Sequence, residues 1–389
     1  MLNRTASHPR LTVAAASALT LVLGSIHAFS VFVPEWERQT GADRAQVSLI
    51  YSLALVSLTI AVLFGYRVYA RIGPAWMFCC SGVMSALGLL AAARMDSVAG
   101  LYVFYGLIFG AGNGLGYGYA LQLAGQAMPQ SRGKAMAVVT AFYAVGATLA
   151  PALFLTLISA GGNTLALMVA AMVVLLVSLV AGFAVWLSAA TFTGETVNSL
   201  QPLSPRQRAA RLLLWVGYGA GVVAGLMVIG HAYAIASWLN LSARAISIAP
   251  VAVAAGNMTG GFLAGYLADR LHSRTLLIAL PIGSTVGLAL IWSTVGDFSG
   301  LAGLALTGLC YGALIAVYPV AVSGVFGATA APRIYGQIFT AWGMAGLLGP
   351  WLSGWLYDQS ESYTASLAIA VVMSVVSIVA VARCYSTDH

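Results

Sequence analysis

Long apolar runs separated by short polar segments dominate the chain. A helix that crosses the hydrocarbon core of a bilayer needs about 20 mainly apolar residues. That length predicts twelve membrane-spanning helices, at residues 11–33, 46–70, 75–95, 99–125, 135–158, 165–189, 211–238, 245–268, 274–294, 299–324, 335–357 and 363–384. We interpret the first run as a membrane span, because it is too long for the core of a secretion signal. The connections are mostly short, apart from a hydrophilic stretch that divides the spans six and six.

This pattern predicts an all-α membrane protein built from two six-helix halves. We expect an N-terminal bundle at 1–189, a cytoplasmic central loop at 190–210 and a C-terminal bundle at 211–389. The segment 34–46 between the first two spans is expected to be a solvated outer connection.

Composition agrees with this class of protein and excludes others. Of the 389 residues, 60% are hydrophobic and 7% are charged, where a soluble domain carries about 25% charged residues. The mean hydropathy is +0.92. These values exclude a soluble enzyme, a disordered chain and a nucleic-acid binder, although the isoelectric point is near 9.3.

The positions of the basic residues indicate the orientation. Cytoplasmic loops of membrane proteins carry an excess of Lys and Arg. With both termini cytoplasmic, the outer loops carry Arg38, Arg44, Arg94 and Arg244, and the other 13 of the 17 basic residues lie on the cytoplasmic side. A missed span would reverse this bias beyond that point, and no reversal occurs. We therefore expect a multi-pass protein of the bacterial inner membrane.

The two halves of the chain resemble each other at an offset of about 200 residues. Four short matches follow in the same order, pairing 27–29 with 231–233, 65–67 with 265–267, 106–110 with 308–312 and 140–142 with 340–342. Such parallel repeats in a transporter place the substrate site near the midplane, at the interface of the repeats.

This architecture resembles the major facilitator superfamily over essentially the whole chain. The segment 265–274, Gly-Tyr-Leu-Ala-Asp-Arg-Leu-His-Ser-Arg, is similar to the superfamily's cytoplasmic loop signature. The resemblance implies that Gly265, Asp269, Arg270 and Arg274 of this segment act in gating and in orientation. It implies the same for Arg67, which lies in the degenerate copy of the segment in the first half. It further implies a secondary transporter that works by alternating access, and not an enzyme.

Within the superfamily, three segments resemble the oxalate/formate antiporter and monocarboxylate porter branch. They are residues 224–231, residues 128–133, and residues 339–343 followed by Gly349-Pro350. This branch implies transport of small organic anions, often with a proton or by exchange. Members that handle dicarboxylates carry two basic residues at positions that here hold Gly261 and Trp342. The chain therefore lacks a fixed cationic clamp for a dianion, which favours a monocarboxylate.

Two histidines are the leading candidates for proton coupling. Ionisable groups inside a membrane are costly and are functional candidates by default. No Lys, Arg, Asp or Glu falls in the middle of a predicted span, whereas His27 and His231 occupy repeat-equivalent positions. Histidine titrates near neutral pH. The alternative is that each is a neutral histidine that hydrogen-bonds a neighbouring helix.

Other polar and aromatic residues are candidates to line the cavity, or simply to pack between helices. They are Ser30, Asn113, Tyr117, Gln122, Asn257, Tyr311, Tyr318 and Trp342. The glycines at 106, 110, 114 and 118 stand four apart, which favours a helix–helix contact. Met227, His231 and Met258 form a weaker alternative as a Cu(I) site, because thioether and imidazole ligands suit that ion.

The sequence shows no nucleophile–base constellation and no phosphate-binding loop, so we expect no catalytic residues, no cofactor and no metal. The predicted partners are a small-molecule substrate, the lipid bilayer and, as a hypothesis, protons, with the chain acting as a monomer. Two alternatives remain open: a transporter of a neutral, cationic or hydrophobic compound or of copper, and a non-transporting membrane sensor.

Overall fold

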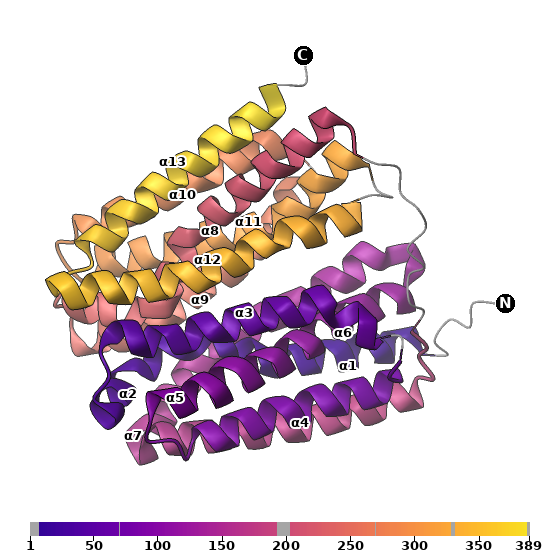
Figure 1. The fold of residues 1–389 in the computed structure, drawn as a ribbon, viewed down its shortest axis with the longest axis horizontal. Coiled ribbons are helices and arrows are strands. Elements are labelled where there is room, and N and C mark those ends of the chain that lie inside the picture. Colours follow the sequence, from indigo (N-terminus) through magenta and orange to yellow (C-terminus); the bar gives the residue numbers. More distant parts are fainter. Residues whose placement is uncertain (1–7, 70, 193–202, 269, 328–330, 387–389) are drawn as a thin grey trace. The chain divides into compact units, whose positions relative to one another are not determined.

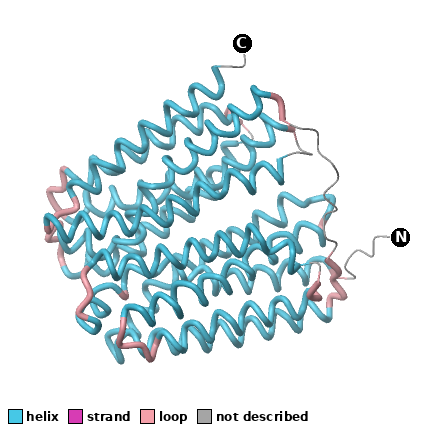
Figure 2. Tube along the Cα trace, viewed as in Figure 1, coloured by secondary structure: helices cyan, strands magenta, loops and turns pink. Residues whose placement is uncertain are grey.

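The computed structural model describes residues 8–69, 71–192, 203–268, 270–327 and 331–386. Every regular element in these ranges is a helix (Figure 1). Short turns at the helix ends make most of the described connections (Figure 2). By its internal contacts the chain divides into two units, Met1–Ala42 with Leu53–Thr196, and Asp43–Ser52 with Val197–His389.

Unit 1 holds the helices of the first half of the chain. They are α1 (Pro9–Leu23), the 3-10 segment η1 (Gly24–Val31), α2 (Val33–Thr40), the larger part of α3 (Arg44–Tyr69), α4 (Pro74–Ala92), α5 (Val98–Leu101), the π-helical segment η2 (Tyr102–Phe109), α6 (Gly110–Ala127), the 3-10 turn η3 (Pro129–Ser131) and α7 (Arg132–Leu187). Proline near the start of α1 and of α4 suits the first turn, where the missing N–H has no helical partner.

Unit 2 holds the helices of the second half and the first two turns of α3. Its helices are α8 (Pro205–Trp238), α9 (Ala243–Ala268), α10 (Ser273–Trp292), α11 (Asp297–Phe326), α12 (Ala331–Ser360) and α13 (Thr364–Ser386). A capping box starts α8: the Ser204 hydroxyl accepts the Gln207 N–H, and the Gln207 side chain accepts the Ser204 N–H. These bonds satisfy backbone donors that the first helical turn leaves open.

Ten of the described helices are long and apolar enough to cross a membrane. One of them, α7, is 56 residues long and breaks at Gly161 and Gly162, so it supplies two spans. With α12, which has the length of a span at 30 residues, the described helices provide the twelve predicted crossings. The predicted all-α membrane fold is confirmed.

A glycine pair and an acidic side chain make the break in α7. Gly162 has φ of +68°, a backbone conformation that residues with a Cβ rarely adopt. The Glu35 carboxylate accepts the N–H of Asn163 at 2.8 Å, and the Asn163 amide donates to the Phe32 carbonyl at 2.9 Å. The second half of α7 therefore starts from a capped end.

The predicted solvated connection at 34–46 contains a short helix that the sequence analysis did not foresee. Residues 33–40 form α2, whose side chain Trp36 is 1% exposed and packs against the rings of Phe29, Phe32 and Tyr105. The physical reason is that Val33 and Trp36 stand three apart and share one helix face, so a short amphipathic helix buries both.

The glycine stripe of the first half is a helix contact, as expected. A Cβ added at Gly110 or at Gly114 of α6 would collide with the backbone of Ala54 or of Leu58 on α3. The second half repeats the arrangement between α9 and α11, where a Cβ at Gly308 would collide with the Val253 backbone. These glycines allow the backbones to approach closely.

Candidate functional site

The first helix of unit 1 changes geometry where its candidate residues lie. It runs as α1 to Leu23 and continues as the 3-10 segment η1, which carries His27. The amide of Asn113 on α6 donates to the Leu23 carbonyl at 2.6 Å, and Asn113 is fully buried. Short 3-10 segments within a longer helix often mark functional hinges. Asn113 satisfies a backbone group at this junction.

Three of the predicted residues contact the side chain of Tyr143. Its hydroxyl donates to the Asn113 side-chain oxygen at 3.2 Å. Its ring meets the His27 ring edge-on at 5.6 Å between centroids and lies 4.7 Å from the Tyr117 ring. We call His27, Asn113, Tyr117 and Tyr143 the Tyr143 group. The group presents hydroxyl, amide and imidazole groups and carries no fixed charge.

Sequence reasoning missed Tyr143 itself. The repeat match at 140–142 ends one residue before it, and Tyr143 lies three residues after Thr140 on the same face of α7. The hydroxyls of Thr140 and Tyr117 are hydrogen-bonded, so this face of α7 could have been found from the helical spacing.

Two other predicted residues of unit 1 do not join the Tyr143 group. Ser30 is buried on η1, and its hydroxyl has no hydrogen-bond partner among the described residues. Gln122 is half-buried on α6. Neither shows a hydrogen bond to the Tyr143 group within the described part of the chain.

In unit 2, three predicted residues belong to one aromatic cluster. The Trp342 indole N–H donates to the Tyr311 hydroxyl at 2.9 Å. The Phe339 ring stacks on Trp342 at 5.2 Å with an interplanar angle of 9°. Tyr218 links this pair to Tyr318, with ring centroids 6.5 Å from Phe339 and 4.2 Å from Tyr318. We call these five residues the Trp342 group.

Asn257 and the methionines lie elsewhere in unit 2. Asn257 is half-buried on α9, where its backbone and side chain leave no room for a Cβ on Gly312 of α11. Met227 is buried on α8 and would contact a Cβ on Gly349 at 3.6 Å. Met258 is half-buried on α9.

His231 is fully buried within a hydrogen-bond network outside the Trp342 group. Its Nε2 lies 2.8 Å from the Pro350 carbonyl oxygen and 3.3 Å from the Ser48 hydroxyl, and its Nδ1 lies 3.0 Å from the Tyr363 hydroxyl. Both ring nitrogens therefore have partners, and a copper ion at Met227, His231 and Met258 would have to displace one of them. Among the described residues no cluster of three His, Cys, Asp or Glu side chains has metal-binding geometry.

The residues next to His231 were not predicted as site residues. The carboxylate of Asp358 accepts the backbone N–H of Arg44 at 3.0 Å and that of Ala45 at 2.7 Å, which caps the start of α3. The Arg44 guanidinium donates to the Tyr363 hydroxyl at 3.1 Å and lies 4.3 Å from the centre of the Tyr357 ring. Sequence analysis had placed Arg44 among the charges of the outer loops.

The predicted gate residues that the structure describes lie near helix ends. The side chain of Arg67 is exposed near the end of α3 and lies 5.0 Å from the centre of the Phe64 ring. Arg270 and Arg274 are exposed. Gly265 lies in α9, and Asp269 is outside the described residues.

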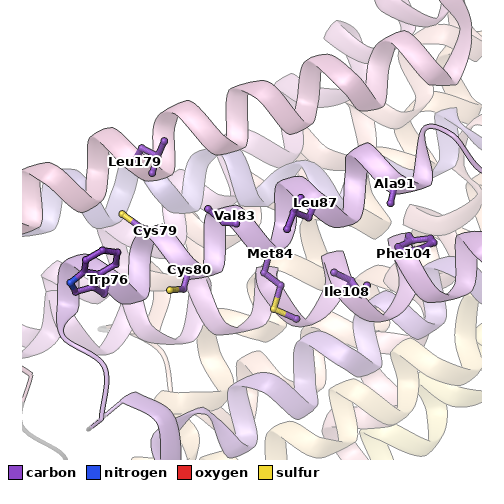
Figure 3. A pocket seen from close by; sticks show the side chains of 10 residues that line it. All are labelled: Trp76, Cys79, Cys80, Val83, Met84, Leu87, Ala91, Phe104, Ile108 and Leu179. Carbon is purple, nitrogen blue, oxygen red and sulfur yellow. The ribbon is translucent and has the colours of Figure 1, made fainter.

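Unit 1 also has an apolar groove of about 890 Å³. Side chains of α4, η2 and α7 line it without a charged group: Trp76, Cys79, Cys80, Val83, Met84, Leu87, Ala91, Phe104, Ile108 and Leu179 (Figure 3). Trp76 is 72% exposed at one end. Such a groove suits hydrocarbon and offers no polar group that would orient a small anion.

Comparison with known proteins gives the family of this architecture. The family model described as Major Facilitator Superfamily matches residues 14–240 and again residues 216–389. Two similar proteins are an oxalate:formate antiporter of Oxalobacter formigenes, 24% identical over 92% of this chain and 87% of that protein, and monocarboxylate transporter 13 of Rattus norvegicus, 27% identical over 90% of this chain and 82% of that protein.

An Escherichia coli protein described as the uncharacterized MFS-type transporter YhjX is 24% identical over 87% of this chain and 85% of that protein. Among solved structures, a bacterial homolog of the human lysosomal transporter Spinster matches with a TM-score of 0.73 at 14% identity, over 98% of both chains. At this identity the structural match supports the fold alone.

Proposed function

Since the chain belongs to the Major Facilitator Superfamily, we propose that this membrane transporter carries a small organic anion, most readily a monocarboxylate, by alternating access. Transport of a small molecule across a membrane and the absence of an enzymatic role follow from the family and from its relatives. The names of two relatives, an oxalate:formate antiporter and a monocarboxylate transporter, support the choice of an organic anion.

The observation that carries the choice of a monoanion is the chemistry of the two candidate groups. The Tyr143 group and the Trp342 group offer hydroxyl, amide, imidazole and indole groups without a fixed charge. Gly261 and Trp342 occupy the two positions where dicarboxylate-handling members of the branch carry cations. Neutral donors suit a single carboxylate, whereas a dianion would have to give up the water around two charges without a cation to compensate.

We further propose that His27 couples transport to protons. Its ring lies edge-on to Tyr143, which itself bonds to Asn113 at the junction of α1 and η1. Histidine changes charge near neutral pH, so a protonated His27 would pair with a carboxylate and a neutral one would release it.

The membrane location, orientation and oligomeric state complete the proposal: a monomer of the bacterial inner membrane with both termini cytoplasmic, as the distribution of basic residues favours.

Flux into proteoliposomes tests this function. Vesicles that contain the purified protein should take up radiolabelled formate, acetate or lactate faster than empty vesicles, and faster when the outside is at pH 5.5 than at pH 7.5. His27→Gln should remove most of this pH dependence. His8→Gln is the matched control, because His8 is exposed directly before α1 and lies outside the loop signature at 265–274. Absence of monocarboxylate uptake would refute the substrate class, and an unchanged pH profile in His27→Gln would refute proton coupling at that residue.

A second candidate substrate is an aromatic or cationic organic compound. The stacked rings of Phe339 and Trp342 favour it, because the face of an aromatic ring attracts cations and stacks on other rings. The same vesicles distinguish the two, since uptake of a labelled aromatic amine in place of the carboxylates would support this candidate.

A further inference from the structure

The start of α3 is fastened to the helices of unit 2. Residues 43–52 belong to unit 2 by their contacts, while the rest of α3 belongs to unit 1. Asp358 of α12 accepts the N–H groups of Arg44 and Ala45, and a Cβ on Gly354 would approach the Ser48 hydroxyl to 2.7 Å. The Tyr51 ring would lie 3.5 Å from a Cβ on Gly230 of α8. The first two turns of α3 therefore pack closely against α8 and α12.

A chain of side-chain hydrogen bonds continues from this contact into the buried interior of unit 2. Arg44 donates to the Tyr363 hydroxyl at 3.1 Å, Tyr363 lies 3.0 Å from His231 Nδ1, and His231 Nε2 lies 2.8 Å from the Pro350 carbonyl. Tyr363 and His231 are both fully buried. We call Arg44, Tyr363, His231 and Pro350 the α3 relay.

The Pro350 carbonyl and the Arg44 guanidinium determine the directions of the two outer bonds of the α3 relay, and the protonation of His231 decides the direction of the middle bond. A carbonyl only accepts, so His231 Nε2 carries a hydrogen and donates to Pro350. A guanidinium only donates, so the Tyr363 oxygen accepts from Arg44. In neutral His231 the hydrogen is therefore on Nε2, and Nδ1 can accept the hydrogen of the Tyr363 hydroxyl.

A proton on His231 would change this arrangement. Nδ1 would become a donor, so the Tyr363 hydroxyl would have to turn its own hydrogen away, and the positive imidazolium and the positive guanidinium of Arg44 would both bond the same oxygen. Among the described residues, Asp358 and Tyr357 on α12 and Asp43 directly before α3 are further ionisable groups near the relay. Asp358 is engaged by two backbone N–H groups and has no bond to His231.

We propose that Arg44 is a positioning residue which, through Tyr363, holds His231 neutral and so keeps residues 43–52 fastened to α8 and α12, and that a proton on His231 releases them. The link from this release to transport rests on the proposed function. The release itself depends only on the relay and can be measured without a substrate.

Labelling of a buried cysteine in α3 tests the release. Ala45 is 7% exposed and its neighbour Gln46 is exposed. In a background without the four native cysteines, Ala45→Cys reports the release, and Gln46→Cys corrects for the change of thiol reactivity with pH. The measured quantity is the ratio of the two maleimide labelling rates, in liposomes at pH 5.5 and at pH 8.

We expect the ratio in the otherwise unchanged protein to be low at pH 8 and several times higher at pH 5.5. Arg44→Leu should raise the ratio at pH 8 by about tenfold, because loss of a hydrogen bond to a charged group changes a population by that order. Arg44→Lys retains a donor and should restore much of the low ratio. Arg38→Leu is the control, because Arg38 is exposed on α2.

Two results would overturn the proposal: a corrected ratio that does not change with pH, or a ratio at pH 8 that is the same in Arg44→Leu and in Arg38→Leu. If Arg44→Leu does not fold, Tyr363→Phe removes the same link while it keeps the ring, and the same comparison applies. Because labelling needs no substrate, its failure is distinct from a failure of monocarboxylate uptake.

Discussion

Replacement of Asn113 should destabilise unit 1 more than replacement of any other amide on α6. The side chain is fully buried and makes two bonds: its nitrogen donates to the Leu23 carbonyl at 2.6 Å, and its oxygen accepts the Tyr143 hydroxyl at 3.2 Å. Asn113→Ala removes both of these hydrogen bonds at once. It leaves the Leu23 carbonyl at the junction of α1 and η1 without its side-chain donor.

The expected loss follows from the two bonds and their surroundings. A buried polar group left without a partner costs about 1–3 kcal/mol, and an ordinary hydrogen bond contributes about 1 kcal/mol. Both side-chain bonds are lost, so we expect Asn113→Ala to lower the free energy of unfolding by about 2 kcal/mol. Tyr143→Phe breaks only the second bond and should cost about 1 kcal/mol.

Unfolding of the purified protein in mixed micelles of a mild detergent and dodecyl sulfate measures these differences. Gln122→Ala is the matched control, because Gln122 is a half-buried amide on the same helix that has no hydrogen bond to the Tyr143 group. Its effect should stay within about 0.5 kcal/mol. If Asn113→Ala were no more destabilising than Gln122→Ala, or less so than Tyr143→Phe, the assignment of Asn113 as the partner of the helix junction would be wrong.

Two further predictions concern glycines. Gly114→Leu should lower the free energy of unfolding by about 1–3 kcal/mol, because its Cβ would collide with the Leu58 backbone. Gly336→Leu should cost less in the same unfolding assay, because a Cβ at Gly336 would meet no atom of the described residues within 4 Å beyond its own helix backbone. Gly261→Lys should let oxalate compete with monocarboxylate uptake, because a Cβ there would lie 3.9 Å from the Gly312 carbonyl oxygen of the neighbouring helix, with no closer contact from other helices among the described residues, so the new cation has room. Gly324→Lys, also open around its Cβ, is the control, and equal competition in both variants would contradict the prediction.

The number and class of the helices were predictable because they depend on local properties of the chain. Apolar length decides which segments can cross a bilayer, and capping residues such as Ser204 decide where a helix such as α8 begins. The 3-10 geometry of η1 and the break in α7 were not predictable in this way. Their partners, Asn113 and Glu35, lie 90 and 128 positions away in the sequence, and no local pattern reports such a contact.

The candidate residues show the same division between local and distant information. Unusual polar residues in apolar helices led to His27, Asn113 and Tyr117, and the structure brings these together. Arg44 and Asp358 were missed as a pair, because each lies at a helix end where charges are ordinary and 314 positions separate them. Only the folded chain shows that the acid of α12 caps α3.

The two histidines illustrate why repeat symmetry predicts position better than role. Both stand in the first long helix of their half, as the repeat requires. His27 lies on a 3-10 segment beside Tyr143, whereas His231 lies in the uninterrupted α8 and donates to Pro350. A duplicated sequence preserves the place of a residue on its helix, but its partners come from other helices and diverge independently. Mutations of the two histidines should therefore have different effects. His27→Gln should alter the pH profile of uptake and leave the labelling of Ala45→Cys unchanged. His231→Gln should abolish the pH dependence of that labelling.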